Sequence, residues 1–223
     1  NDHIDTRGTA DGLDCRAAGV AHFDTAYAYT GGASERLLGA LIRPEREAIF
    51  LATKAGYEGG SSRANILTTF DESRQRLGCD HVDLLYLHRW DDTTALEETF
   101  ETLAELQQQK LIGHIGVSNF AAWQVMKAQS VAQNLGTRID FIQPMYNLVK
   151  RQVEVEILPM CQSEAIIPCT YSPLGGGLLT GKYSSDTSQG RLVTDTRYAA
   201  RYGLPEMHAA ATRLNALAAA LNT

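Results

Sequence analysis

The sequence predicts an α/β fold in which parallel strands alternate with crossover helices. Three observations carry this prediction. Short apolar runs recur along the chain, segments with helical periodicity separate them, and each apolar run ends in a residue with useful chemistry. Alternation of this kind is typical of a parallel sheet covered by helices, either a (β/α)8 barrel or an open, doubly wound sheet.

Six apolar runs are the predicted strands. They are rich in β-branched and aromatic residues and lack a clean alternation of polar and apolar positions. This pattern is typical of strands that are buried on both faces, as in a parallel sheet. The runs cover residues 19–24, 48–54, 81–88, 111–119, 139–143 and 165–172.

Helical patterns fill the gaps between these runs. Leu96, Phe100 and Leu103 share one helical face after the cap-like residues 90–94, and Gly78 is placed to end the preceding helix. Four more helices are predicted at residues 34–42, with Ser34 at the cap, and at residues 120–136, 152–164 and 205–221. Residues 182–195 are predicted to form a polar loop.

Composition narrows the class of protein. The chain has 223 residues, a net charge of −6 and 44% hydrophobic residues, without a run rich in lysine or arginine. This argues against a nucleic-acid partner, and no apolar run approaches the roughly 20 residues of a membrane span. The four cysteines form no C-x-x-C pair. They predict scattered core thiols in a reducing compartment, the cytoplasm, and no metal site.

The residues at the strand ends favour the barrel. In a barrel these ends converge on one mouth, whereas in an open sheet they spread along an edge. The sequence also lacks a G-x-G-x-x-G motif after the first strand. Six successive runs end in, or just before, a chemically useful side chain, namely Asp24, Lys54, His88, Asn119, Gln143 and Tyr171.

Four side chains together suggest a general acid. Each one alone has an ordinary structural interpretation, such as a turn aspartate or a solvated lysine. Together, Asp24 would hold Lys54 as a cation, and Lys54 beside the Tyr29 phenol would stabilise phenolate and lower its pKa from about 10. His88 would hydrogen-bond the phenol or a substrate oxygen. We expect an acid that works near neutral pH.

Seven motifs in order resemble the aldo-keto reductases, from about Gly19 to Lys182. They are FDTAYAY with SERLLG, LATK, DLLYLH, GVSNF, QPMYN and YSPLGGGLLTGK. The resemblance implies a (β/α)8 barrel that reduces aldehydes and ketones with NADPH. It implies that Tyr29 is the general acid, tuned by Asp24, Lys54 and His88.

The resemblance also assigns the cofactor contacts. It implies that Ser118, Asn119 and Gln143 hold the nicotinamide carboxamide and that Tyr171 stacks on the nicotinamide ring. The backbone of Ser172, Pro173 and Leu174 would follow the pyrophosphate, with help from Lys182. Gly176, Gly181 and Lys182 also have the spacing of a phosphate-binding P-loop, but Tyr183 stands where that motif needs Ser or Thr. The P-loop spacing is therefore interpreted as incidental.

The predicted barrel is incomplete. Residues 1–223 supply the second to seventh strands of one aldo-keto-reductase-like domain, without its first and eighth strands or the segment that binds the adenosine 2′-phosphate. We therefore expect NADP as cofactor but do not exclude NAD. The substrate is expected to be a small carbonyl compound, with Tyr27, Tyr57 and Trp90 as candidate contacts. The oligomeric state stays open.

Two alternatives to a carbonyl reductase remain. One is a cofactor-binding, redox-sensing regulatory subunit of the potassium-channel β type, which resembles the same family and would turn over slowly. The other is an inactive fragment, which would fail to bind the cofactor.

Overall fold

The computed structural model describes residues 15–183 and 189–221, and the chain divides into two compact units. Unit 1 contains the described residues up to Gln143 together with Ser163–Pro168. Unit 2 contains Pro144–Gln162 and the described residues from Cys169 onward.

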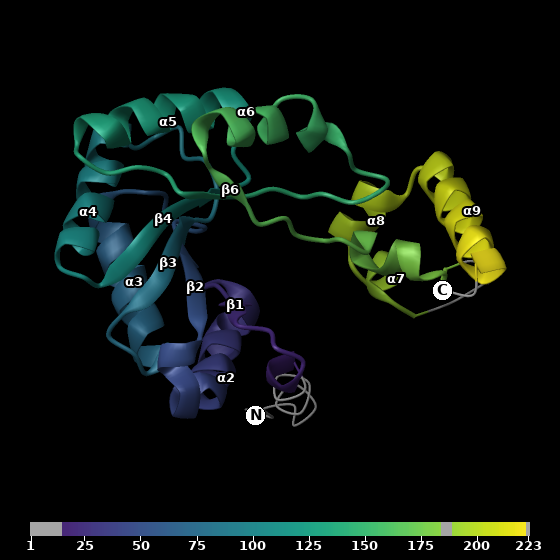
Figure 1. Cartoon of the computed structure of the whole chain (residues 1–223), viewed down its shortest axis with the longest axis horizontal. Coiled ribbons are helices and arrows are strands. Elements are labelled where there is room, and N and C mark those ends of the chain that lie inside the picture. The colour runs from purple at the N-terminus through teal and green to yellow at the C-terminus, as the bar shows by residue number, and fades with distance from the viewer. Residues whose placement is uncertain (1–14, 184–188, 222–223) are drawn as a thin grey trace. The chain divides into compact units, whose positions relative to one another are not determined.

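Unit 1 is built on a six-stranded sheet in which every neighbouring pair is parallel and the spatial order follows the chain (Figure 1). This confirms the predicted parallel strands with crossover helices. The strands are β1 (His22–Asp24), β2 (Phe50–Ala55), β3 (Val82–Leu87), β4 (Ile112–Ser118), β5 (Phe141–Gln143) and β6 (Ile167–Pro168).

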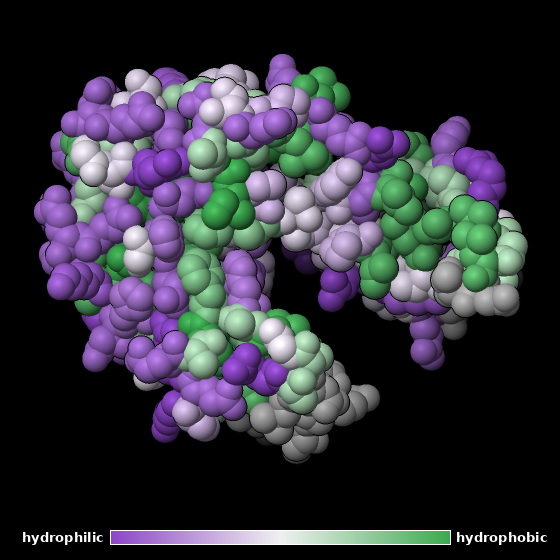
Figure 2. All heavy atoms as spheres, viewed as in Figure 1, coloured by the Kyte–Doolittle hydropathy of each residue, from purple (hydrophilic) through white to green (hydrophobic). Residues whose placement is uncertain are grey.

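The helices of unit 1 follow the strands in alternation. They are η1 (Tyr29–Gly32), α2 (Ala33–Ile42), η2 (Arg43–Ala48), α3 (Arg63–Leu77), α4 (Leu96–Gln108) and α5 (Ala122–Asn134). Phe70 on α3 and Phe100 and Leu103 on α4 are fully buried against the sheet, as the helical spacing predicts. Polar side chains cover the outer faces of α3 and α4 in Figure 2. The amphipathic pattern therefore sets which face of each helix meets the sheet.

Of three helix ends predicted from the sequence in unit 1, one agrees with the structure and two do not. Gly78 ends α3 in the left-handed conformation at φ +66°, as predicted. Ser34 does not cap α2, because the cap position is Gly32 and the hydroxyl of Thr30 accepts from the Ser34 N–H at 3.1 Å. The cap-like residues 90–94 do not cap α4 either, since Ala95 takes that position without a side-chain bond.

Unit 2 is mainly helical. Its elements are η3 (Gln152–Glu154), most of α6 (Ile157–Glu164), η4 (Gly175–Thr180), α7 (Arg191–Thr194), α8 (Thr196–Tyr202) and α9 (Pro205–Leu221). Its core joins Leu178 and Leu179 of η4 to Tyr202 of α8 and Ala211 of α9.

The sequence underestimates the helical content of unit 2 between Lys182 and Asp195. Part of the predicted polar loop lies outside the described residues, and α7 occupies another part. Figure 2 shows apolar side chains at the surface of the C-terminal helices. The exposed large hydrophobic residues include Leu204, just before α9, and Leu217 on α9. None of the helices in the described ranges has the length and apolar character that crossing a bilayer requires.

Candidate active site

The ends of β1 and β2 bring Asp24 and Lys54 together. Asp24 is the last residue of β1, and its register partner on β2 is Ala52, two residues before Lys54. Lys54 is 1% exposed, and its side chain forms an ion pair with Oδ1 of Asp24 and donates to the backbone oxygen of Thr25 at 2.7 Å. The predicted pairing of these two residues is present in unit 1.

The environment of Lys54 pulls its pKa in two directions. Burial lowers the pKa of the ammonium group, while the charge and the hydrogen bond of Asp24 oppose that shift. The pKa is lowered overall. A buried cation of this kind keeps its charge only because a carboxylate lies beside it.

Tyr29 lies next to this ion pair. The Lys54 Nζ atom is 4.9 Å from the centroid of the Tyr29 ring, and the His88 ring meets that ring edge-on at 5.7 Å. Tyr29 is 38% exposed, so its ring is accessible at the carboxyl ends of the strands. Asp24, Lys54, Tyr29 and His88 therefore form one cluster, as the sequence predicts.

His88 is buried directly after β3. Its backbone N–H donates to Ala55 at the end of β2, and the side chain packs against the Tyr57 ring at 4.8 Å. Burial, with help from the charges of Lys54 and Arg89, lowers the pKa of His88 from 6.5 to about 4. The imidazole is therefore neutral at physiological pH, and its buried Nδ1 has no hydrogen-bond partner among the described residues.

Ser118, Asn119 and Gln143 form a polar network at the ends of β4 and β5. Ser118 Oγ donates to the backbone oxygen of Gln143 at 2.9 Å, and Asn119 Nδ2 donates to the backbone oxygen of His88 at 3.0 Å. Gln143 Nε2 donates to Oδ2 of Asp24 at 3.0 Å. Asn119 has a left-handed backbone at φ +59°, a conformation that Asn tolerates better than most residues. The network joins the predicted cofactor residues to the predicted catalytic cluster.

The remaining predicted cofactor residues lie in unit 2. Tyr171 bridges to Met145, and the Ser172 oxygen accepts from Nδ2 of Asn147 at 2.9 Å. Pro173 follows, and the exposed Leu174 caps η4.

The glycine run of η4 cannot accommodate larger residues. Gly175, Gly176 and Gly177 all have positive φ. A Cβ on Gly176 would meet the Tyr198 ring at 2.8 Å, and one on Gly177 would meet the Lys182 side chain at 2.6 Å. Glycine is therefore favoured in this run for its backbone conformation and, at Gly176, also for space.

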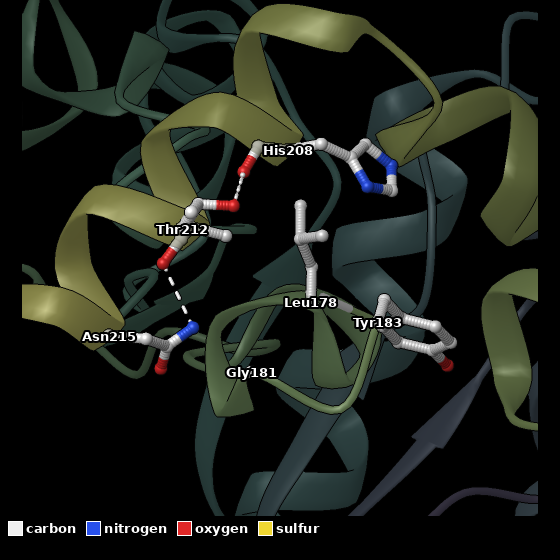
Figure 3. A pocket seen from close by; sticks show the side chains of 7 residues that line it. Leu178, Gly181, Tyr183, His208, Thr212 and Asn215 are labelled. Atoms are coloured by element: carbon white, nitrogen blue, oxygen red, sulfur yellow. Dashed lines mark hydrogen bonds between the residues drawn. The ribbon is translucent and has the colours of Figure 1, made fainter. Parts of the chain in front are cut away.

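The structure around Gly181 and Lys182 does not match that of a P-loop. The turn of η4 precedes Gly181, so the glycines do not open a helix at Lys182. Beside them lies a cavity of about 30 Å³, lined by Leu178, Tyr183 and residues of α9 (Figure 3). Its volume is too small for a nucleotide, which needs several hundred Å³.

The candidate substrate residues have different surroundings. The Tyr57 ring contacts the His88 ring and also the Arg89 guanidinium, which is 5.2 Å from the ring centroid. The Tyr27 ring lies against the guanidinium of Arg76 at 4.8 Å. Arg89 is not selected by the sequence reasoning, although its place directly after His88 at a strand end is a usable signal.

Trp90 belongs to an aromatic group that the sequence does not reveal. Its ring packs on Phe120 at 5.2 Å and on Trp123 at 5.7 Å. Trp90 lies three residues after the end of β3, Phe120 lies two residues after the end of β4, and Trp123 lies in the first turn of α5. Their position after a strand end is the signal that could have found them.

Comparisons with known proteins identify the family to which the sequence is similar. The family model of the aldo/keto reductase family matches residues 15–223. Aflatoxin B1 aldehyde reductase member 2 of Mus musculus is 37% identical over 179 residues, which cover 78% of this chain and 49% of that protein. A probable voltage-gated potassium channel subunit beta of Oryza sativa subsp. japonica is 36% identical over 196 residues, covering 83% of this chain and 58% of that protein.

A solved structure extends the comparison to three dimensions. The glycerol dehydrogenase from Gluconobacter oxydans superposes with a TM-score of 0.82 at 28% identity, covering 98% of this chain and 69% of that one. The chain spans about half the length of the curated relatives that it matches. Because the family model matches most of the sequence, the chain belongs to the aldo/keto reductase family.

Proposed function

We propose that this chain carries the catalytic cluster of an NAD(P)H-dependent oxidoreductase that reduces aldehyde or ketone carbonyls to alcohols. The observation that carries the proposal is the packing of Tyr29 against both Lys54 and His88, at strand ends that also hold Asp24. A phenol beside a buried cation and a neutral imidazole is suited to giving a proton to a carbonyl oxygen.

Each residue of the cluster has a role in this proposal. Tyr29 donates its hydroxyl proton to the carbonyl oxygen as the alcohol forms. Lys54 stabilises the negative charge left on the Tyr29 oxygen, and Asp24 keeps Lys54 charged despite its burial. His88 is neutral and donates a hydrogen bond that orients the carbonyl.

The polar network at β4 and β5 fits a nicotinamide carboxamide. That group presents one acceptor and one donor pair, and Ser118, Asn119 and Gln143 supply hydroxyl and amide groups of both kinds. When bound, the reduced nicotinamide supplies the hydride for the carbonyl carbon. For unit 2, taken by itself, we propose from the family resemblance that Tyr171, the backbone of residues 172–174 and Lys182 are cofactor contacts.

NADP is the cofactor that we propose, with NAD as the alternative.

The family match runs without interruption through both units, which supports one barrel domain. The four cysteines all lie within the described ranges and form no disulfide there, which supports a reducing compartment such as the cytoplasm.

The test is the Tyr29→Phe variant. It removes the proposed proton donor and leaves the ring and the cofactor residues in place. We expect kcat to fall by roughly 10²-fold or more, the usual contribution of a general acid, while the Kd for NADPH stays nearly unchanged. NADPH absorbance with a panel of aldehydes, ketones and sugars measures the first quantity, and fluorescence titration measures the second.

Tyr146→Phe is the matched control. It removes a phenol that donates to Glu154 in unit 2, and it should leave kcat unchanged. A Tyr29→Phe variant with wild-type kcat would show that another group donates the proton.

A second candidate function is a cofactor-binding regulatory subunit. The observation that favours it is the similarity to the rice protein named as a probable potassium channel subunit. Such a protein would bind NADPH tightly and oxidise it slowly with every carbonyl in the panel. Rapid turnover with any small aldehyde excludes it, and failure to bind NADPH at all excludes both candidates.

A further inference from the structure

The loop that carries Tyr29 has an unusual backbone. Thr30, Gly31 and Gly32 follow Tyr29 with φ values of +46°, +60° and +82°. Left-handed conformations at successive positions, one of them a β-branched residue, persist only where surrounding contacts hold them. The bond from the Tyr29 N–H to the Ala26 oxygen and the cap from the Thr30 hydroxyl supply part of this support from within the loop.

Arg76 supports this loop from the last turn of α3. Its guanidinium lies 4.8 Å from the centroid of the Tyr27 ring, two residues before Tyr29. A Cβ built on Gly32 would lie 2.8 Å from the Arg76 side chain, so that side chain also touches the backbone at the other end of the loop. Arg76 therefore contacts the loop on both sides of Tyr29.

The position of Arg76 is fixed by two carboxylates. Its Nη1 donates to Glu35 at 3.0 Å and its Nη2 to Glu72 at 2.6 Å. Glu35 is completely buried, and its other oxygen accepts from the Thr53 hydroxyl at 2.6 Å. Thr53 immediately precedes Lys54 on β2. The contacts from Thr53 through Glu35 to Arg76 thus connect β2, which carries Lys54, to the loop that carries Tyr29.

We propose that Arg76, held by Glu35, is a positioning residue that fixes the Tyr29 ring against Lys54. This inference rests on the proposed function, since the placement matters only if Tyr29 is the proton donor. The planar guanidinium is needed because it stacks on Tyr27 while its two ends bind two different carboxylates. A lysine at this position keeps the positive charge, but its compact ammonium group lacks the planar fork that stacks on Tyr27 and binds both carboxylates.

The test is Arg76→Lys in the purified protein, with Arg74→Lys as the matched control. Arg74 lies on the same turn of α3 with similar exposure, but it pairs with Asp71 and packs on Phe70. We expect Arg76→Lys to lower kcat by about 10-fold to 100-fold, as misplacement of a catalytic group by about 1 Å does. The KM for NADPH should not change, and Arg74→Lys should have neither effect.

A spectroscopic measurement separates placement from general loss of stability. Tyrosine labelled with carbon-13 at Cζ gives a resonance for each of the nine tyrosines, and Tyr29→Phe identifies the one from Tyr29. Because that carbon senses the nearby Lys54 charge and His88 ring, its resonance should move in Arg76→Lys and stay in place in Arg74→Lys. An unmoved resonance together with wild-type kcat would overturn the proposal.

The two hypotheses fail in different ways. If the wild-type protein reduces no carbonyl, the proposed function fails, and the Tyr29 resonance still decides whether Arg76 positions the ring. If Arg76→Lys does not fold, Tyr27→Leu replaces it, because this change removes the stacked ring and keeps the bond from Arg76 to Glu35. Tyr27→Leu is expected to move the Tyr29 resonance and lower kcat in the same direction, and an unchanged Tyr27→Leu protein overturns the proposal.

Discussion

Burial of His88 makes the stability of the protein depend on pH. The structure lowers the pKa of the imidazole from 6.5 to about 4, chiefly by burial. Between these values the unfolded chain binds a proton that the folded chain does not bind. The unfolding free energy therefore falls as the pH falls from 6.5 towards 4. The folded protein therefore has its full stability above pH 6.5, the ordinary pKa of the imidazole, and loses stability as the pH falls below that value.

The size of the effect follows from the two pKa values. One unit of difference corresponds to about 1.4 kcal/mol, so the full loss is about 3 kcal/mol. At about pH 5 the unfolded imidazole is almost fully protonated and the folded one is mostly neutral. The expected loss between about pH 7 and about pH 5 is then about 2 kcal/mol. This is a large fraction of the 5–15 kcal/mol that is usual for a folded protein.

The measurement is urea unfolding of the wild type and of His88→Gln at both pH values, followed by tryptophan fluorescence. Other groups also titrate in this range, so the informative quantity is the difference between the two proteins. His88→Gln should lose about 2 kcal/mol less than the wild type on acidification. His81→Gln, which removes an imidazole just before β3, is the control for the loss of a histidine as such. Equal losses in the wild type and His88→Gln would refute the assigned pKa.

Two more predictions concern the framework of the site. Gly39→Ala should lower the unfolding free energy by about 1–3 kcal/mol in urea, because its Cβ would overlap the backbone oxygen of Leu77. Asp91→Ala should cost a similar amount in a thermal melt followed by circular dichroism. Its carboxylate accepts from the N–H of Ser61 at 2.7 Å and so ties the loop after β2 to the loop after β3. Asp92→Ala, next to it and bonded to a side chain rather than to the other loop, is the control and should melt close to the wild type.

The strands and their ends are predictable because buried parallel strands leave a plain signal. Each apolar run ends at a polar residue, and parallel order places such residues at one edge of the sheet. The sequence alone therefore brings Asp24, Lys54 and His88 together. The placement of Tyr29 depends on its offset from Asp24 and on the family resemblance, since it lies in a loop and not on a strand.

Contacts between distant side chains are not predictable in the same way. Residue type assigns the caps to Ser34 and to residues 90–94, but the backbone places Gly32 and Ala95 at those positions. The Asp91 carboxylate is then available to bind another loop. Neither the composition nor the helical periodicity predicts that the guanidinium of Arg76, in the last turn of α3, packs against the Tyr27 ring. Such contacts follow from the packing of α2 on α3, which a single sequence does not encode locally.

Asp24 has the most constrained role in the cluster. One of its oxygens pairs with Lys54, which lies beside the proposed proton donor Tyr29. The other oxygen accepts from the amide of Gln143, a proposed contact of the nicotinamide carboxamide. The pairing is needed because Lys54 is buried and would otherwise lose its charge. The amide of Gln143 is thereby oriented by the same charge that holds the lysine. In the proposed function, proton transfer and cofactor orientation therefore both depend on one carboxylate at the end of β1, which contacts Lys54 of the neighbouring β2 and Gln143 of the more distant β5.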